Sequence, residues 1–319
     1  MGEPEGRRLE ENPRYLWTLF RSAVDYIALN TETGRDMVHR AKPYPDPFVF
    51  SHLEAHAGAE LGAWVGMLDE PAPLILFVPG TFATKDASNT RAKVLRLQDE
   101  VGAHAVALDQ RGFGHSSTTR STGGYLEAFD LAHIADHFSQ DQRVEEIILV
   151  GESLGAAASL LAPVRSRGSI TGVLAINPFA DLEWVIRFIA THPPRSHAFH
   201  VAYHAFKTLL RHITGRQDEE FDAYMAKTAT SLGMTMAELS YHASPRFHLG
   251  ELQVPTLILH AVDDPIIPAF HAHILREVAR ENPLVNTHLT RTGGHTYFDL
   301  VDEAWYWDTV LGFLREVIS

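Results

Sequence analysis

The chain has 319 residues, 45% of them hydrophobic and 21% charged, and a formal net charge of −13. This size and composition suit one large α/β domain with an insertion, or two ordinary domains, and are unlike those of a disordered chain. The negative charge argues against nucleic acid or an anionic membrane as the main partner. The sequence contains no cysteine, which excludes a disulfide framework, a thiolate nucleophile and a cysteine-ligated metal.

Apolar runs of strand length recur along the chain, separated by stretches of helix length. They are continuous rather than alternating, which is typical of a parallel sheet covered on both faces. Within the first seventy residues, a helix at 15–29 and then a hairpin that leads into the sheet are expected. Strands are predicted at 62–67, 74–78, 103–108, 147–150, 172–176 and 256–260, with a weaker one at 287–290.

The stretch from 178 to 252 contains no predicted strand, only helical patterns such as 198–212 and 221–225. A connection of this length usually carries structure and function of its own. We therefore predict a helical cap at 178–252, a core formed by 48–177 and 253–319, and a helical N-terminal extension at 1–47.

Residues 151–155 read Gly-Glu-Ser-Leu-Gly, directly after the predicted strand at 147–150 and before an alanine-rich, helix-prone segment. A Gly-x-Ser-x-Gly sequence between strand and helix is typical of a nucleophile elbow. The tight turn leaves no room for side chains at its two outer positions and exposes the hydroxyl of Ser153 at a helix N-terminus. The alternative is a structural serine in a glycine-rich turn.

An active serine needs a base, a carboxylate that orients the base, and donors for an oxyanion. His295 follows two glycines after the last predicted strand, and Asp263 and Asp264 follow the strand before it. Asp181, after the strand that follows the elbow helix, is a third candidate for the acid. The segment 78–82 can present a backbone N–H beside that of Leu154.

In this order, the motifs Asp-x-Arg-Gly-x-Gly-x-Ser at 109–116, Gly-x-Ser-x-Gly at 151–155, Asp-x-x-x-Pro at 264–268 and Gly-Gly-His at 293–295 resemble the α/β-hydrolase family. The double aspartate and the Gly-Gly-His ending look most like its YheT-type branch. The resemblance implies an α/β-hydrolase fold, with Ser153 as nucleophile, His295 as base and Asp264 as orienting acid. It also implies the backbone N–H groups of Thr81 and Leu154 as oxyanion donors. Many members have His-Gly before the first donor, where this chain has Pro79-Gly80.

Other polar residues have a structural and a functional interpretation. His133 and His137 lie four residues apart near Asp130 and Asp136, as metal ligands on one helix face do, but no third convergent ligand is identifiable. A solvated helix face is therefore the preferred interpretation. Arg111 is interpreted as a partner for turn carbonyls or a carboxylate. An apolar stripe in the N-terminal helix is expected to pack on the core or cap, with a homodimer contact as the alternative; it comprises Leu16, Trp17, Phe20, Val24 and Ile27.

These observations predict a serine hydrolase that cleaves a carboxylic ester of a small to medium hydrophobic substrate without a metal or an organic cofactor. Thioester, lactone or carbon–carbon cleavage by the same groups is the alternative, and a non-catalytic ligand receptor is the alternative of another class. No secretory signal and no membrane span are visible, so the cytoplasm is the default location. The residues expected to contact substrate are Phe82, Glu152, Phe179, Trp184 and Phe188.

Overall fold

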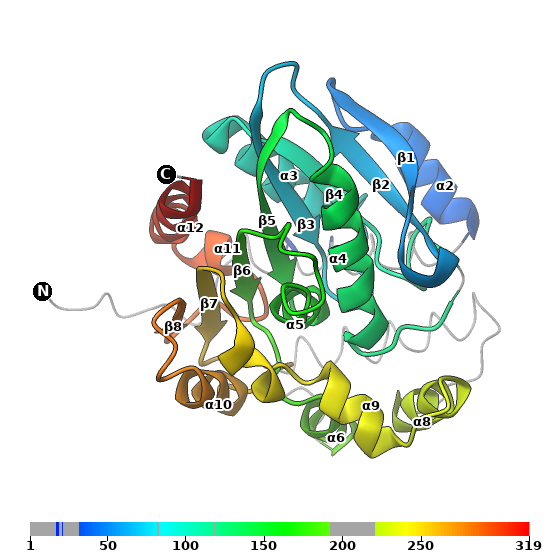
Figure 1. Cartoon of the computed structure of the whole chain (residues 1–319), viewed down its shortest axis with the longest axis vertical. Helices are drawn as coiled ribbons and strands as arrows, with labels where there is room; N and C mark the ends of the chain where they lie inside the picture. The colour runs from blue at the N-terminus through cyan, green and yellow to red at the C-terminus, as the bar shows by residue number, and fades with distance from the viewer. Residues whose placement is uncertain are drawn as a thin grey trace, which may run out of the picture.

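A single eight-stranded sheet forms the centre of the computed structural model, which describes residues 17–18, 21, 32–81, 83–117, 119–191 and 221–318 (Figure 1). Its spatial order is β1-β2-β4-β3-β5-β6-β7-β8. β1 pairs with β2 and β2 with β4 in antiparallel fashion, and the remaining neighbours are parallel. The strands are β1 Phe48–Glu54, β2 Glu60–Gly66, β3 Ala72–Val78, β4 His104–Leu108, β5 Val144–Glu152, β6 Gly172–Ile176, β7 Thr256–Ala261 and β8 Val285–Thr290.

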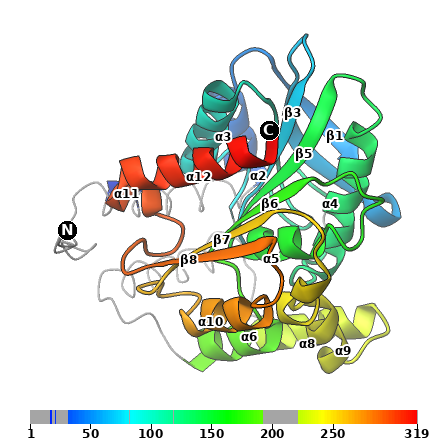
Figure 2. The same cartoon turned by 60° about the vertical axis from the view of Figure 1, so that its left-hand side comes forward.

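The central strands are largely apolar because helices cover both faces of the sheet. In β3, Leu74 and Leu76 belong to one buried cluster, whereas Ile75 and Phe77 belong to the cluster on the other face. The first cluster includes residues of α4 Tyr125–Phe138, α5 Leu154–Leu161 and α10 Phe270–Val278; the second includes residues of α3 Ser88–Val101, α11 Phe298–Val301 and α12 Glu303–Ile318 (Figure 2). A further helix, α2 Glu32–Ala41, lies beside β1 and stacks its His39 on Trp64 of β2.

Three helices gather at one end of the molecule: α6 Leu182–Thr191, α8 Phe221–Ser231 and α9 Met236–Ala243 (Figure 1). Two short 3-10 turns, Pro245–Phe247 and Leu249–Glu251, lead from them back to β7. A third buried cluster joins the three helices to Leu154 and Ala157 of α5. The described part of 178–252 is therefore helical and packs on the helix that follows the elbow. The proposed domain division itself stays a prediction.

The predicted fold class is confirmed, and all seven predicted strands are present. The predicted hairpin is β1 and β2, which pair from Phe48–Gly66 to Glu54–Glu60. Most of the predicted N-terminal helix with its apolar stripe, and the helical pattern at 198–212, lie outside the described residues. Among the residues described, no helix combines the length and the apolar character that crossing a membrane requires.

The two outer glycines of the elbow are required by close backbone packing. A Cβ on Gly151 would lie 2.4 Å from the carbonyl oxygen of Gly155, and a Cβ on Gly155 would lie 2.2 Å from that of Val78. Both contacts are with backbone, which cannot rotate away as a flexible side chain does. α5 is consequently held against the end of β3.

We expect Gly155→Ala to lower the melting temperature by several degrees or to prevent folding, because overpacking of this kind costs about 1–3 kcal/mol or more. Gly312→Ala is the matched control, since Gly312 is exposed in α12 and a Cβ there meets nothing within 4 Å. It should stabilise the protein by about 0.5–1 kcal/mol through helix propensity. Thermal melts followed by circular dichroism test both changes, and equal melting temperatures for the two variants would contradict this account of the elbow.

A buried histidine fastens α10 to the loop after β6. Nδ1 of His271 accepts a hydrogen bond from the N–H of Ala180 at 3.2 Å, and its side chain is fully buried. Burial lowers the pKa of His271 to about 3. In the unfolded chain this imidazole binds a proton near pH ~6.5. The unfolded state therefore binds more protons between these two pH values, so stability falls as the pH decreases from about 6.5 to about 3.

His271→Gln should make the melting temperature fall less between pH 7 and pH 4.5 than it does in the wild-type protein, because the linked protonation is removed. His133→Gln makes the same chemical change at an exposed imidazole and should leave the wild-type pH dependence in place. Melting temperatures measured across this range in both variants give the comparison. If the melting temperature of His271→Gln decreases with pH as steeply as that of the wild type, this histidine is not a source of acid instability.

Candidate active site

Ser153 occupies the turn between β5 and α5 in a strained backbone conformation. Its φ of 54° and ψ of −116° lie in a region that residues other than glycine rarely adopt. The backbone N–H of Ser153 donates to the carbonyl of Ile176 at 2.9 Å, which ties the turn to the end of β6. The hydroxyl stands at the N-terminus of α5, where partial positive charge favours a developing anion.

Two backbone N–H groups lie next to this serine. Leu154 is the first residue of α5, so its N–H has no acceptor within the helix. On the other side, a Cβ on Gly80 would lie 2.9 Å from Cβ and 3.6 Å from Oγ of Ser153, which places the Gly80–Thr81 segment against the nucleophile. The hydrogen bonds formed among the described residues leave the N–H groups of both Thr81 and Leu154 without an acceptor. They are available to a ligand oxygen.

The half-buried His295 and the buried Asp264 form a pair at the ends of β8 and β7. Nδ1 of His295 lies 2.8 Å from Oδ2 of Asp264, whose side chain is fully buried. The other carboxylate oxygen accepts the N–H groups of Ile266 at 2.8 Å and Ile267 at 2.9 Å. A carboxylate accepts at Nδ1, so the proton of neutral His295 sits there and Nε2 is left as a base. No hydrogen bond between Ser153 Oγ and His295 is formed in the described part of the chain, and such bonds often tighten only with substrate bound.

The two other candidate acids have different partners. Oδ1 of Asp263 accepts the N–H of Gly294 at 2.8 Å, and burial raises the pKa of its carboxyl. Asp181 accepts the N–H of Trp184 at 2.9 Å at the start of α6, and its second oxygen lies 2.8 Å from Nε of Arg246. Of the three carboxylates, Asp264 is the one that the structure pairs with His295.

Asn177, which follows β6, is part of the site although the sequence analysis did not single it out. Its φ is 51°, and its side-chain amide donates to Oδ2 of Asp264 at 2.5 Å and to the carbonyl of Gly294 at 3.3 Å. It therefore holds the acid and the loop of His295 together. The Asn-Pro pair after a strand marks a strand end in the sequence, but does not show which groups the amide reaches.

Comparison with known proteins identifies the family to which the chain belongs. The model of the family described as serine aminopeptidase, S33 (Hydrolase_4), matches residues 69–299, more than two thirds of the chain. The chain belongs to this family. It is a hydrolase of the α/β-hydrolase fold.

Two curated relatives are lipases by name. The lysophosphatidylserine lipase ABHD12 of Rattus norvegicus is 27% identical over 202 residues, which cover 62% of this chain and 43% of that protein. The phospholipase ABHD3 of Mus musculus is 29% identical over 247 residues, which cover 71% of this chain and 58% of that protein. The hydrolase thus spans about half the length of these relatives. The YheT-type branch is not shown by the comparisons and stays a prediction.

Solved structures agree on the fold. The esterase Pf2001 of Pyrococcus furiosus superimposes with a TM-score of 0.62 at 14% identity, covering 85% of this chain and 93% of that one. The 2,6-dihydroxy-pseudo-oxynicotine hydrolase gives the same TM-score at 16% identity, with 93% and 80% covered. At such identities the likeness establishes the architecture alone.

The residues predicted to contact substrate are dispersed in the hydrolase. Phe179 is buried in the cluster that contains the first residue of α5. Trp184, by contrast, is 41% exposed, and the guanidinium of Arg246 lies 4.6 Å from its ring centroid. Phe188 is half-buried on the same helix, and Phe82 lies outside the described residues. Their roles stay predictions, and the placement of Phe179 suits a substrate contact best.

Glu152 has a structural partner. Its carboxylate lies 2.6 Å from Nζ of Lys93, and both side chains are almost completely buried. This geometry favours a hydrogen-bonded support beneath the elbow over the substrate contact predicted for Glu152. Arg111 is likewise paired, with its Nε 2.7 Å from Asp130, as expected for a structural partner of a carboxylate.

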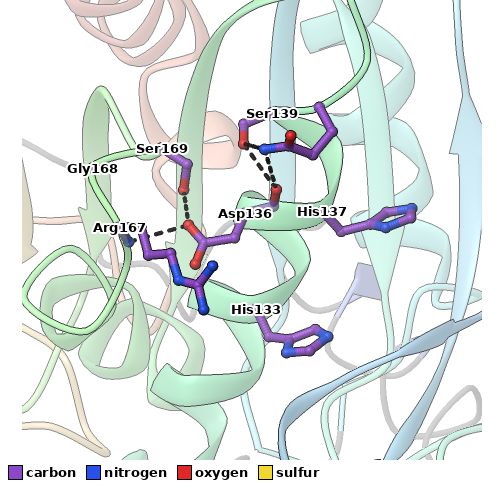
Figure 3. Close-up of a pocket in the computed structure, with 8 residues that line it drawn as sticks. His133, Asp136, His137, Ser139, Arg167, Gly168 and Ser169 are labelled. Carbon is purple, nitrogen blue, oxygen red and sulfur yellow. Dashed lines mark hydrogen bonds between the residues drawn. The ribbon is translucent and has the colours of Figure 1, made fainter.

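His133 and His137 do not share a cation site with the nearby carboxylate. Figure 3 shows both imidazoles on one side of α4 and Asp136 on the other. There Asp136 accepts hydrogen bonds from the hydroxyl of Ser169 at 2.7 Å and the N–H of Arg167 at 3.2 Å. The surface pocket in this view is lined by His133, Asp136, His137, Ser139, Gln140, Arg167, Gly168 and Ser169.

Within the described ranges, three potential metal-ligand atoms converge instead at His39, Asp86 and His115. The buried ammonium of Lys85 already lies among them, 2.7 Å from Oδ2 of Asp86 and 2.9 Å from Nδ1 of His115. It also contacts Asp109, at 2.9 Å. A lysine charge thus takes the place that a metal cation would need, and the cluster does not fit a metal.

Replacing Asp264 by Asn should lower kcat by roughly 10²–10⁴, because the carboxylate that fixes the tautomer and orientation of His295 is lost. Asp263→Asn removes a neighbouring carboxylate that contacts Gly294 and should cost less than about tenfold. Steady-state kinetics on a chromogenic ester, with melting temperatures as a folding control, compare the two variants. The opposite ranking would assign the orienting role to Asp263.

Proposed function

We propose that the protein hydrolyses carboxylic esters with a hydrophobic acyl group through an acyl-enzyme at Ser153. The observation that carries the proposal is the pairing of His295 with the buried Asp264 at the same sheet edge as a strained elbow serine. Two unpaired backbone N–H groups beside that serine complete a set suited to acyl transfer.

In the proposed reaction, Nε2 of His295 takes the proton of Ser153 as its oxygen attacks the substrate carbonyl. The N–H groups of Thr81 and Leu154 hold the oxyanion, and Asp264 stabilises the imidazolium. The imidazolium then protonates the departing alcohol. Water, activated by the same imidazole, releases the acid and restores the serine.

A lipid-like ester is the substrate class that the surroundings favour. The cluster formed by α6, α8 and α9 places apolar side chains against Leu154, one residue from the nucleophile. Ligand sites that take apolar groups are lined in this way, with few polar anchors. The relatives named as lysophosphatidylserine lipase and phospholipase agree with such a substrate. The family description names an aminopeptidase, so family membership alone does not show which type of bond the protein hydrolyses.

Ser153→Ala should abolish turnover while the protein stays folded, with a rate loss on the order of 10⁴–10⁶ for removal of a nucleophile in such a unit. The wild-type protein is assayed on p-nitrophenyl esters of increasing acyl length, a thioester, a lactone and an aminoacyl amide. Fluorophosphonate should label the wild type and not the variant. We expect the esters of medium acyl length to be the best substrates.

Each alternative has its own outcome in this panel. A preference for the thioester, lactone or amide would support the same chemistry at Ser153 acting on another type of bond. Labelling of Ser153 without turnover of any substrate would support the non-catalytic receptor. A folded Ser153→Ala protein that keeps more than about a tenth of the activity would rule out acyl-enzyme chemistry at this residue.

A further inference from the structure

Lys93, on α3, reaches the two loops that carry the nucleophile and the base. Its Nζ donates to Oε1 of Glu152 at 2.6 Å and to the carbonyl oxygen of Thr296 at 2.9 Å. Glu152 directly precedes Ser153 in the chain, and Thr296 directly follows His295. One ammonium group is therefore bonded to the immediate neighbours of both reacting side chains.

This ammonium is buried and charged. The side chain of Lys93 is 3% exposed, and a carboxylate oxygen of Asp299 lies 4.0 Å from Nζ. Burial alone would lower the pKa of Lys93, but the charges of Glu152 and Asp299 outweigh it and leave the pKa raised. Lys93 thus keeps its positive charge, and charged donors form the stronger hydrogen bonds.

Both loops that Lys93 joins are strained. Ser153 has a φ of 54° and Thr296 a φ of 68°, values that favour glycine. Strained residues persist only where the surroundings fix them, and they gather at functional sites. A shared hydrogen-bond donor is a means of holding two such segments in one arrangement.

We propose that Lys93 is a positioning residue that sets the separation of Ser153 and His295 by bonding Glu152 and Thr296 at once. The inference rests on the proposed function, since it concerns the reaction at Ser153. It matters because the base has to reach first the serine oxygen and then the leaving group. A displacement of about 1 Å in such a set costs as much as 10²-fold in rate.

The other interpretation is that the ion pair only supports the fold. Buried ion pairs are weak evidence for stability, because desolvation cancels much of their attraction. A purely structural pair would change the melting temperature when either partner is replaced, and kcat per folded molecule would stay the same. Kinetics separate the two interpretations.

The pH profile adds a second readout, because several charged groups surround His295. Asp264 contacts it directly, Asp263 bonds the neighbouring N–H of Gly294, and His260 lies near enough on β7 for the two imidazoles to interact. From α3, Lys93 bonds the carbonyl of Thr296 in the same loop, and Glu152, Asp299 and Tyr306 act electrostatically on Lys93. Replacing Glu152 by Gln removes one negative charge and leaves the ammonium, which disfavours the imidazolium.

The test compares Glu152→Gln with the double variant Lys93→Met/Glu152→Gln, which removes both charges of the Lys93–Glu152 pair. Glu152→Gln keeps an oxygen that accepts from Lys93 and leaves the bond from Lys93 to Thr296 in place, so both ties persist and kcat should fall by no more than about threefold. The acid limb of its pH–rate profile should move to lower pH by roughly 0.5 pH unit. The double variant lacks a donor for Thr296, and its kcat should fall roughly 10–100-fold at nearly unchanged KM.

Arg96→Met is the matched control, since Arg96 lies on the same helix and forms a pair with Glu303 at 2.6 Å that is exposed to solvent. It should keep the wild-type kcat and pH profile. Equal kcat for the double variant and Glu152→Gln, with an unmoved acid limb, would overturn the proposal. If the double variant does not fold, fluorophosphonate labelling rates of Lys93→Gln and Glu152→Gln replace kcat: a slower Lys93→Gln supports the proposal, and equal rates overturn it.

Ser153→Ala, run in the same assay, separates failure of this inference from failure of the proposed function. Loss of activity in Ser153→Ala together with unaffected Lys93 variants would remove the positioning role and keep the serine chemistry. Retained activity in Ser153→Ala would remove both.

Discussion

The backbone contact between the elbow and the end of β3 is the constraint on which the rest of the site depends. A Cβ on Gly155 would lie 2.2 Å from the carbonyl oxygen of Val78, so glycine alone lets α5 begin this close to the neighbouring strand. The same approach forces Ser153 into a positive-φ conformation. It also sets the N-terminus of α5 beside the loop of Gly80, which brings together two N–H groups that have no acceptor among the described residues.

The acid of the site is stabilised by hydrogen bonds and not by a cation. Asp264 is fully buried and accepts from Asn177, His295 and two backbone N–H groups of its own turn. A cation there would neutralise the field that stabilises an imidazolium. Amide and backbone donors leave that field in place, which suits a carboxylate whose task is to orient a base.

The sequence predicted those parts of the molecule that depend on local chemistry. Continuous apolar runs identified the strands because both faces of the sheet are covered, and the glycine spacing identified the elbow because the turn tolerates no side chains there. The choice of Asp264 over Asp263 rested on motif spacing, and the structure pairs Asp264 with His295.

The contacts missed by the sequence analysis are those between distant segments. Lys93 is 59 positions from Glu152 and 203 from Thr296, and no periodicity records such a meeting. Asn177 looked like an ordinary loop residue for the same reason. For Trp184 the helical pattern revealed an apolar face but not the element that the face meets. The structure turns this side chain towards Arg246 instead.

Buried ion pairs recur around the loops at the carboxyl ends of the central strands. Lys85 bonds Asp86 and Asp109, Lys93 bonds Glu152, and Arg111 bonds Asp130. For Asp130, burial outweighs the arginine and raises the pKa to about 6, so this pair is held at an electrostatic cost.

Apolar clusters on the two faces of the sheet supply the stability of the fold, and pairs of this kind add little to it. Charged pairs instead fix the relative positions of the groups that they join. A buried charge that loses its partner costs far more free energy than a displaced methyl group. The loops that hold Ser153 and His295 carry glycines and strained residues that packing alone would leave free to adopt several arrangements. The contacts of Lys93 with Glu152 and Thr296 hold both loops in one arrangement, as the proposed reaction at Ser153 requires.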